Sequence, residues 1–288
     1  MIDTHTHLNF KAFEADWQDV VKRAIENGVE KMIVVGTDLA SSKRAAEMAE
    51  QDRALYASVG IHPHHARKFS ITNNQFPNKF QIQNSKLQNE IRELKELAKH
   101  PRVVAIGEVG LDYHVYKNSK YPSTALRTSS RLIELQKELL KLQVRLAQEL
   151  DKPLIIHSRE VKDEVLETIV KVNPKSRGVF HCFEGPKKYL IKILDAGFYV
   201  GFDGNITYSH DRAEVAKEVP MERLLLETDC PFMLPEPMRS LRKKEGKKLR
   251  SEPKDVKIIG QFHAKSRGIY LNEVESQTNK NVKVLFNL

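Results

Sequence analysis

Short apolar segments alternate with amphipathic stretches along the whole chain, and this alternation limits the possible folds more strongly than any other feature. Strands that alternate with helices indicate a parallel sheet, and eight strands are the number that closes a (β/α)8 TIM barrel. Each segment is almost wholly apolar, as expected for a strand that is buried on both faces. The predicted strands are Met1–Thr6, Lys31–Val35, Ala54–Val59, Val103–Ile106, Pro153–Ile156, Gly178–Phe180, Phe198–Gly201 and Leu224–Glu227.

Helices are predicted between these strands, and no linker that would divide the chain into two domains is visible in the sequence. We therefore expect one barrel over residues 1–288, a size that α/β barrels commonly reach as a single domain. Residues 67–85, which are rich in Asn, Gln, Lys and Phe, are expected to form an enlarged loop after the third strand. The predicted helices are Ala15–Asn27, Ala40–Asp52, Asn84–Lys99, Ser129–Leu150, Glu160–Val172, Lys187–Ala196, Asp211–Val219, Asp255–Arg267 and a last one from Asn272.

The composition argues against several classes of protein. No apolar run approaches the roughly 18 residues that a membrane helix requires. The first residues lack the basic and apolar regions of a signal peptide, so the cytoplasm is the expected compartment. Two cysteines, Cys182 and Cys230, give no disulfide framework, and both are predicted to be packing residues. We expect a monomer without an obligate protein partner.

The chain carries an excess of positive charge that favours a polyanionic partner such as nucleic acid. Lys and Arg number 47 against 38 Asp and Glu, which gives a formal net charge of +9. Residues 239–250 are expected to form a basic loop, which is either an ordinary solvated loop or a segment that meets phosphates. Its basic residues are Arg239, Arg242, Lys243, Lys244, Lys247, Lys248 and Arg250.

Metal-ligand residue types follow five of the eight predicted strands. The C-terminal ends of the strands of a (β/α)8 barrel meet at one rim, and the active site is built there. A single carboxylate at such a position can cap a helix, and a single histidine can pack, but independent packing residues have no reason to share one rim. Four histidines and two carboxylates suit two divalent ions, with a carboxylate able to bridge them. The candidate ligands are His5, His7, Glu108, His157, His181 and Asp229.

Six motifs, in order along essentially the whole chain, resemble those of the TatD family of metal-dependent deoxyribonucleases, within the amidohydrolase-like barrels. A seventh element, Arg250-Ser251-Glu252-Pro253, resembles the Arg-Asn-Glu-Pro of that family. The six motifs are Ile2-Asp3-Thr4-His5-Thr6-His7-Leu8, Gly60-Ile61-His62-Pro63, Ala105-Ile106-Gly107-Glu108-Val109-Gly110-Leu111-Asp112-Tyr113, Pro153-Leu154-Ile155-Ile156-His157-Ser158-Arg159, His181-Cys182-Phe183-Glu184-Gly185 and Leu226-Glu227-Thr228-Asp229-Cys230-Pro231.

The resemblance implies a hydrolase that cleaves phosphodiester bonds of DNA, as a 3′–5′ exonuclease on single strands. It implies that His5, His7 and Asp229 hold one divalent ion, that His157 and His181 hold a second, and that Glu108 bridges the two. The ions would be Zn, Mn, Mg or Co. A water shared by two ions about 4 Å apart can attack phosphorus, and Asp229 is placed to orient or deprotonate that water.

Residues around the ligand set are predicted to support the site. His62 and Arg159 are expected at the rim as phosphate contacts, although Arg159 could instead cap or pair with the following helix. Asp3, Asp112 and Glu227 are candidate acceptors for the second ring nitrogens of the ligand histidines, although each could be a polar residue at the edge of the core. Glu227 is also a candidate substrate contact.

Two alternatives from other classes remain open. One is another metal-dependent hydrolase of the amidohydrolase superfamily, acting on a C–N or C–O bond. Carbamate-bridged members of this superfamily usually have a lysine at the end of the fourth strand, where this chain has Glu108. The other is a nucleic-acid-binding protein without activity, which would be expected to have lost some ligands, whereas all six are present.

Overall fold

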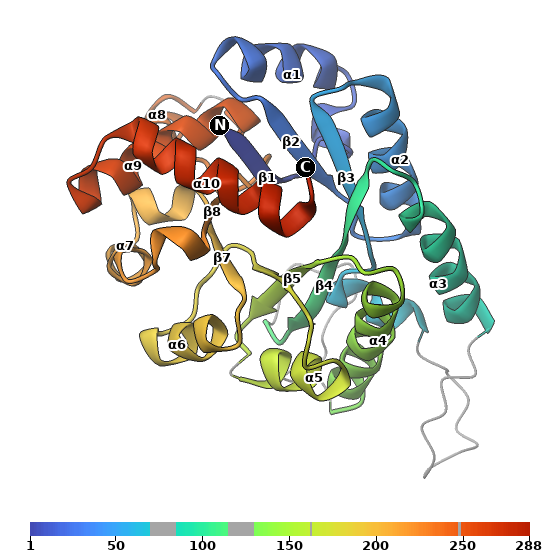
Figure 1. The fold of residues 1–288 in the computed structure, drawn as a ribbon. Coiled ribbons are helices and arrows are strands. Elements are labelled where there is room, and N and C mark those ends of the chain that lie inside the picture. Colours follow the sequence, from blue (N-terminus) through green and yellow to red (C-terminus); the bar gives the residue numbers. More distant parts are fainter. Residues whose placement is uncertain (70–84, 115–129, 162, 247–248) are drawn as a thin grey trace.

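The computed structural model describes residues 1–69, 85–114, 130–161, 163–246 and 249–288. Its sheet contains eight parallel strands that pair in sequence order from β1 to β8, and a further bridge joins Thr6, the last residue of β1, to Cys230, which follows β8. Helices surround the strands (Figure 1), so the predicted (β/α)8 barrel is confirmed. The strands are β1 (Ile2–Thr6), β2 (Lys31–Val35), β3 (Leu55–Val59), β4 (Val103–Asp112), β5 (Leu154–Arg159), β6 (Gly178–Phe180), β7 (Tyr199–Phe202) and β8 (Leu224–Leu226).

The helices agree with the predicted ones to within a few residues at most ends. Helix α2 begins directly after Asp38, whose carboxylate accepts the backbone N–H of Ser41 at 3.0 Å and caps the helix. The helices are α1 (Trp17–Glu26), α2 (Leu39–Gln51), α3 (Ser85–Ala98), α4 (Ser130–Glu149), α5 (Glu164–Val172), α6 (Lys187–Asp195), α7 (His210–Lys217), α8 (Met238–Glu245), α9 (Val256–Arg267) and α10 (Leu271–Phe286).

The barrel interior is filled with apolar side chains and is closed at the N-terminal ends of the strands by α10. The N-terminal amine of Met1 lies 2.6 Å from Glu275 on α10, and both chain termini lie beside this helix (Figure 1). Closure of one end leaves the C-terminal ends of the strands as the accessible face of the barrel, where the predicted site lies. The interior cluster contains Ile2, Ile33, Val35, Val104, Ala105, Ile155, Val179, Tyr199 and Leu225, together with Val282, Leu285 and Phe286 of α10.

Strands β4 and β5 are longer than predicted, because glycines let them approach each other closely. The predicted end of β4 at Ile106 was wrong: the strand continues through Gly107 and Gly110 to Asp112. A Cβ atom on Gly110 would lie 1.9 Å from the carbonyl oxygen of His157, so a larger residue would separate the two strands. Helix α5 in turn begins four residues later than predicted, because Glu160 has a φ of +52°, which an α-helix excludes.

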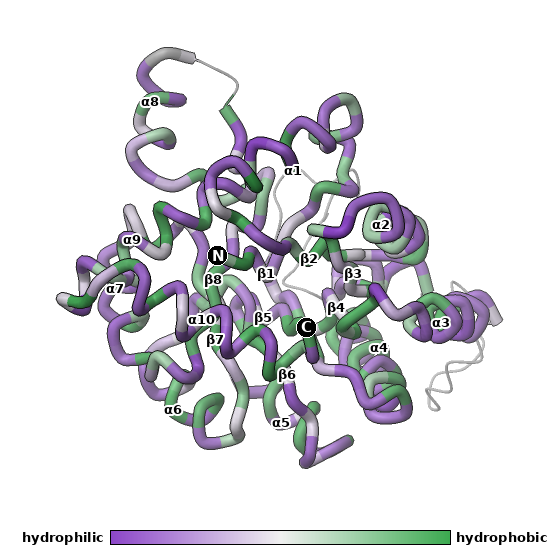
Figure 2. The backbone as a smooth tube through the Cα atoms, turned by 45° about the horizontal axis from the view of Figure 1, so that its top comes forward, coloured by the Kyte–Doolittle hydropathy of each residue, from purple (hydrophilic) through white to green (hydrophobic). Residues whose placement is uncertain are grey.

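The segment predicted as a basic loop is helical over most of its length. Helix α8 covers residues 238–245, and Gly246, with a φ of +63°, ends it in the left-handed conformation that favours glycine. The prediction of a loop was wrong because the basic run consists of good helix formers. Figure 2 shows α8 extending away from the other helices. Lys247 and Lys248 lie outside the described residues.

The predicted loop over residues 67–85 can be assessed only at its ends. Arg67 and Phe69 belong to a short 3₁₀ helix, Pro63–Phe69, and Ser85 begins α3. The rest of this segment lies outside the described residues. Within the described part of the chain, none of the helices combines the length and the apolar composition needed to cross a membrane.

Candidate active site

A cleft of about 480 Å³ opens at the C-terminal ends of the strands. All the predicted ligands except His5 line it, and His5 is fully buried beside them. The predicted phosphate contacts His62 and Arg159 line it as well. The cleft-lining residues are His7, Phe10, Thr37, His62, His64, His65, Glu108, His157, Ser158, Arg159, His181, Cys182, Glu184, Asp229, Phe232 and Met233.

The first group of candidate ligands joins β1 to the segment after β8. His5 and His7 are two positions apart, so the alternation of an extended chain directs both rings to one side. Their Nε2 atoms lie 3.2 Å apart, and Asp229 Oδ1 lies 3.3 Å from His7 Nε2 and 3.8 Å from His5 Nε2. Three donor atoms from two distant parts of the sequence therefore face one point.

The second group joins β4, β5 and the residue after β6. Glu108 Oε1 lies 2.8 Å from His157 Nδ1 and 2.8 Å from His181 Nε2. His62 Nε2 lies 3.4 Å from the same oxygen. This histidine was predicted at the rim, and it lies beside the candidate ligands. The other oxygen, Glu108 Oε2, faces the first group at 3.7 Å from His5 Nε2 and 3.8 Å from His7 Nε2. One carboxylate thus joins the two groups.

The residues present fit divalent ions in both groups. The ligand atoms within each group lie within 4.8 Å of one another, and imidazole and carboxylate are ligands that Zn, Mn and Co bind readily. The Nε2 atoms of His5 and His7 lie 3.2 Å apart, close enough for their two lone pairs to bind one shared cation. The structure therefore brings all six predicted ligands together.

The electrostatics prepare most of these groups for a cation. Burial, with help from His181, lowers the pKa of His5 to about 4, and burial lowers the pKa of His62 to about 3, so both rings are neutral at pH 7. Burial opposes ionisation of Glu108, but the neighbouring His62 and His181 outweigh it and hold the pKa of Glu108 well below its usual value. Neutral imidazoles beside an ionised carboxylate are the protonation states that metal binding requires.

His157 is held by a second carboxylate on the side away from Glu108. Its Nε2 lies 3.1 Å from Asp112 Oδ2, and His64 Nε2 lies 2.7 Å from the same oxygen. Burial alone would lower the pKa of His157, but its hydrogen bonds with Asp112 and Glu108 outweigh burial and raise that pKa to about 9. Asp112 therefore contacts a candidate ligand histidine, as expected from the sequence.

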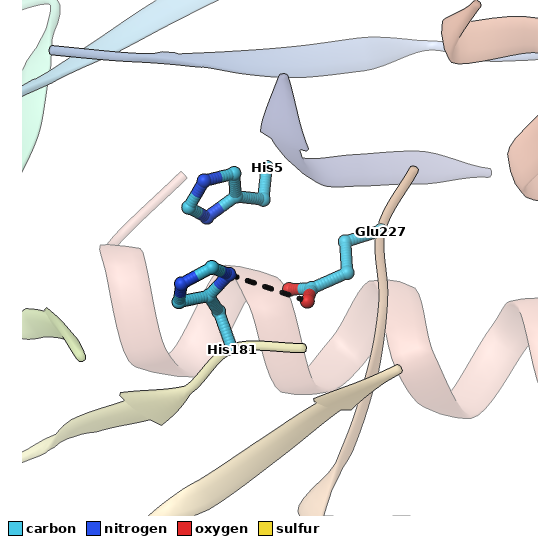
Figure 3. A group of neighbouring side chains, drawn as sticks. All are labelled: His5, His181 and Glu227. Atoms are coloured by element: carbon cyan, nitrogen blue, oxygen red, sulfur yellow. Dashed lines mark ion pairs between the residues drawn. The ribbon is translucent and has the colours of Figure 1, made fainter. Parts of the chain in front are cut away.

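Glu227 lies beside the candidate ligands His5 and His181 (Figure 3) and is not among the residues that line the cleft. Its carboxylate is fully buried, faces His181 Nδ1 at 3.8 Å, and accepts the backbone N–H of Cys182. The prediction of Glu227 as a substrate contact was therefore wrong, since β8 directs its side chain into the barrel. A Cβ atom on Gly201 would lie 2.4 Å from Glu227 Oε2, so glycine at this position makes room for the carboxylate.

One oxygen of this buried carboxylate and two nearby ring nitrogens are unpaired. Among the described residues, His5 Nδ1, His181 Nδ1 and Glu227 Oε2 have no hydrogen-bond partner, and the three side chains form a further potential metal-binding group. Histidines that bind a metal usually donate their other ring N–H to a carboxylate or to water. Glu227 is therefore suited to orient His5 and His181, one from each group of ligands.

Asp3 makes backbone contacts instead. Its carboxylate accepts the N–H groups of His5 and Thr228 at 3.2 and 3.0 Å, and the Thr228 hydroxyl at 2.6 Å. These bonds tie β1 to the segment that carries Asp229 and so fix the first group of ligands. The alternative in which Asp3 is a polar residue of the core fits these contacts better than a bond to a histidine ring.

Several residues at the site were missed by the sequence analysis. Asp203 directly follows β7 and is fully buried, but the predicted strand ended at Gly201, so this carboxylate was not recognised as a rim residue. Phe10 stacks on His7 with ring centroids 4.3 Å apart, and Phe232, which is 49% exposed, stands beside both rings. Their positions close to the His-x-His and Glu-Thr-Asp motifs were the available signal.

Comparisons with known proteins find relatives over the full length of the chain. The model of the TatD-related DNase family matches residues 2–287. The chain is 35% identical to the uncharacterized metal-dependent hydrolase YabD of Bacillus subtilis, covering 100% of this chain and 99% of that protein. It is 32% identical to the 3′-5′ ssDNA/RNA exonuclease TatD of Erwinia tasmaniensis, and the match covers both chains completely.

Solved structures of similar fold also match over the full length of the chain. The crystal structure of YJJV, a TatD homolog from Escherichia coli K12, superimposes with a TM-score of 0.82 at 27% identity, covering 100% of this chain and 98% of that one. A phosphotriesterase homology protein from Escherichia coli, at 15% identity and a TM-score of 0.63, shares the fold. The chain therefore belongs to the family of TatD-related DNases and is a metal-dependent hydrolase.

Proposed function

We propose that this chain hydrolyses phosphodiester bonds of DNA with the help of two divalent ions, and that it removes nucleotides from the 3′ end of single strands. The observation that carries the proposal is the position of Glu108. Its Oε2 faces His5 and His7, while its Oε1 faces His157 and His181. A carboxylate shared between two histidine groups suits a site for two ions, because each of its oxygens can bind one of them.

His5, His7 and Asp229 would hold one ion, His157 and His181 the other, and Glu108 both. Such a pair of ions lowers the pKa of a shared water and offsets negative charge on the phosphoryl oxygens. The ligand types suit Zn, Mn, Mg or Co.

The protein's own residues would position the phosphodiester and move the proton. Asp229 lines the cleft, and its neighbours His7 and His5 outweigh the effect of burial and lower its pKa. The carboxylate is therefore ionised at neutral pH and can accept a proton from the attacking water. His62 and Arg159 line the same cleft and are proposed to contact phosphate oxygens.

The shape and surroundings of the cleft support a single-stranded substrate. Its volume of about 480 Å³ suits a few nucleotide groups rather than a duplex. Phe10 and the half-exposed Phe232 stand beside His7, where their rings can stack on unpaired bases. Met233 at the cleft contacts Tyr208, and Arg239 of α8 stacks on the Tyr208 ring at 4.0 Å, so the basic helix lies next to the site.

The names of several relatives support cleavage from the 3′ end. Proteins named 3′-5′ ssDNA/RNA exonuclease are 30–32% identical to this chain over its full length, and this supports the proposed polarity. DNA is the proposed partner, and a monomer in the cytoplasm remains the expectation. Light scattering of the purified protein tests the oligomeric state.

The deciding experiment is metal-dependent digestion of labelled single strands. The protein is stripped of metal with a chelator, reloaded with Mn²⁺, and mixed with DNA labelled at its 3′ or its 5′ end. A 3′–5′ exonuclease releases the 3′ label at once as a mononucleotide and shortens the 5′-labelled strand stepwise. Cleavage at internal positions would contradict the exonuclease assignment, and a lack of turnover of DNA, RNA and a small phosphodiester would contradict the whole proposal.

The alternative, a hydrolase of C–N or C–O bonds, is tested with the same preparation. Glu108 occupies the position at which carbamate-bridged relatives carry a lysine, and this favours a phosphodiester substrate. Turnover of amides or lactones in the absence of any action on phosphodiesters would support the alternative.

A further inference from the structure

The ends of β6, β7 and β8 bring together a group of potential ligands that is distinct from the two groups around Glu108. Cys182 lies two residues after β6, Asp203 follows β7, and Asp229 lies three residues after β8. One ligand atom of each residue lies within 4.8 Å of the others. We propose that Cys182, Asp203 and Asp229 form an additional divalent metal site that shares Asp229 with the proposed ion pair.

The unsatisfied carboxylate of Asp203 is the observation that points to a cation. Its side chain is fully buried, and its Oδ1 accepts the backbone N–H of Asn205 at 2.8 Å. Its Oδ2 has no hydrogen-bond partner among the residues that the structure describes. A buried oxygen without a partner costs on the order of 1–3 kcal/mol, and more when it is charged. A cation held between this oxygen, Cys182 and Asp229 would offset that cost.

The contacts of Cys182 leave its sulfur able to act as a ligand. The side-chain amide of Asn205 donates to Sγ at 3.6 Å, a weak contact with the sulfur. The distance from Sγ to Glu184 Oε1 is 4.0 Å, a long contact, and Glu184 also pairs with Arg212. Replacing the weak S–H interaction by a metal bond therefore breaks no strong hydrogen bond in the described part of the chain.

The composition of the group indicates which ion it would take and how the ion enters. A thiolate beside two carboxylates favours Zn²⁺ or Co²⁺ over Mg²⁺, because sulfur is a soft ligand. Cys182 and Asp229 both line the cleft, so an ion can reach the group from solvent. Three protein ligands leave a fourth position of a tetrahedral ion open toward the cleft.

The sulfur gives a signal that the proposed ion pair cannot produce. The six proposed ligands of that pair are histidines and carboxylates, so a thiolate-to-cobalt charge-transfer band in the near ultraviolet would report on a cysteine ligand, and Cys182 is the cysteine of the additional site. The inference rests on the proposed function only in sharing Asp229. Loss of nuclease activity with a persisting band would therefore count against the proposed function and leave the additional site in place.

The experiment is titration of the reduced, metal-free full-length protein with Co²⁺, followed by absorption spectroscopy and by elemental analysis after removal of free metal. We expect the charge-transfer band in the wild-type protein and in Cys230→Ser, whose sulfur lies outside the group. Cys182→Ser should lose the band. Asp203→Asn, which has nearly the same shape, should lose the band and bind one Co²⁺ fewer than the wild type.

Two results would overturn the inference. One is a wild-type protein that is saturated with Co²⁺ and shows no thiolate band, because this observation requires no variant and is independent of folding defects. The other is an Asp203→Asn protein that keeps both the band and the wild-type stoichiometry, since Asp203 would then be a buried carboxyl group without a role in metal binding.

Discussion

Asp112 Oδ2 lies 3.1 Å from His157 Nε2, so the Nδ1 atom of the same ring faces Glu108. Asp112 is buried, and the contact joins the last residue of β4 to the neighbouring strand β5. Asp112 therefore orients the His157 ring by holding the nitrogen that points away from Glu108.

Asp112→Asn should weaken binding of the ion that His157 holds. The amide keeps the shape of the carboxylate but loses its charge, and removal of such an outer partner typically lowers metal affinity by roughly 10- to 100-fold. Isothermal titration of the metal-free protein with Mn²⁺ or Zn²⁺ should show one weakened site and one unchanged site. An unaltered isotherm would mean that the bond to His157 does not support the ligand.

Glu227→Gln should weaken both ions, in contrast to Asp112→Asn. Glu227 lies beside His181 of one group and His5 of the other (Figure 3), and the amide nitrogen of Gln cannot accept an N–H from either ring. The same titration should show two weakened sites, each by roughly 10- to 100-fold. Weakening of a single site would show that Glu227 serves one histidine only.

Glu108→Ala should abolish turnover and reduce occupancy by both ions while the fold persists, because this carboxylate faces both histidine groups. Elemental analysis and circular dichroism measure the two effects. Glu93→Ala is the matched control, since Glu93 pairs with Lys43 at the surface between α2 and α3. Near-normal activity of Glu108→Ala would show that the proposed bridge is wrong.

Replacing Lys243 and Lys244 of α8 by Gln should weaken binding of single-stranded DNA and flatten its salt dependence. Both residues are exposed on a helix whose Arg239 stacks on Tyr208, and Tyr208 contacts Met233 at the cleft. If each lysine meets one phosphate, the slope of log K against log salt should decrease by roughly 1.4 in total. Fluorescence anisotropy at several salt concentrations measures the slope.

The control for α8 is the pair Lys280→Gln and Lys283→Gln, which removes the same charge from exposed positions on α10, at the closed end of the barrel. Cleavage of a small phosphodiester should be similar in both double variants. Equal slopes in the two variants would show that the lysines of α8 are ordinary solvated surface.

His263→Phe should reduce the loss of stability in mild acid. Burial, with help from Arg267, lowers the pKa of His263 to about 3, so below pH 6.5 the unfolded chain binds a proton that the folded protein does not. The stabilising contribution is complete above pH 6.5 and decreases as pH falls toward 3. Between pH 7.5 and 5 the free energy of unfolding of the wild type should decrease by about 2 kcal/mol more than that of the variant. Urea unfolding with a chelator present measures the difference, and equal pH dependence of the two proteins would contradict the assignment.

The sequence alone was sufficient to predict the barrel and its candidate ligands, because both depend on short-range patterns. Alternation of apolar strands with helices defines a parallel sheet, and the alternation of side chains along an extended segment places His5 and His7 on one side. The rim position of Asp229 follows from the strand before it. These positions depend only on the neighbouring residues in the sequence and not on contacts with distant parts of the chain.

The tertiary structure decided the relations between residues that are distant in sequence. Contact between Glu108 and His157, 49 residues apart, depends on the close approach of β4 and β5 at Gly110, where a side chain would collide with the backbone. Burial of Glu227 and the position of Asp203 beside Asp229 depend on the lengths of β7 and β8 and on the space that Gly201 leaves. Local propensity carries no information on these distances, because packing of the assembled barrel sets them.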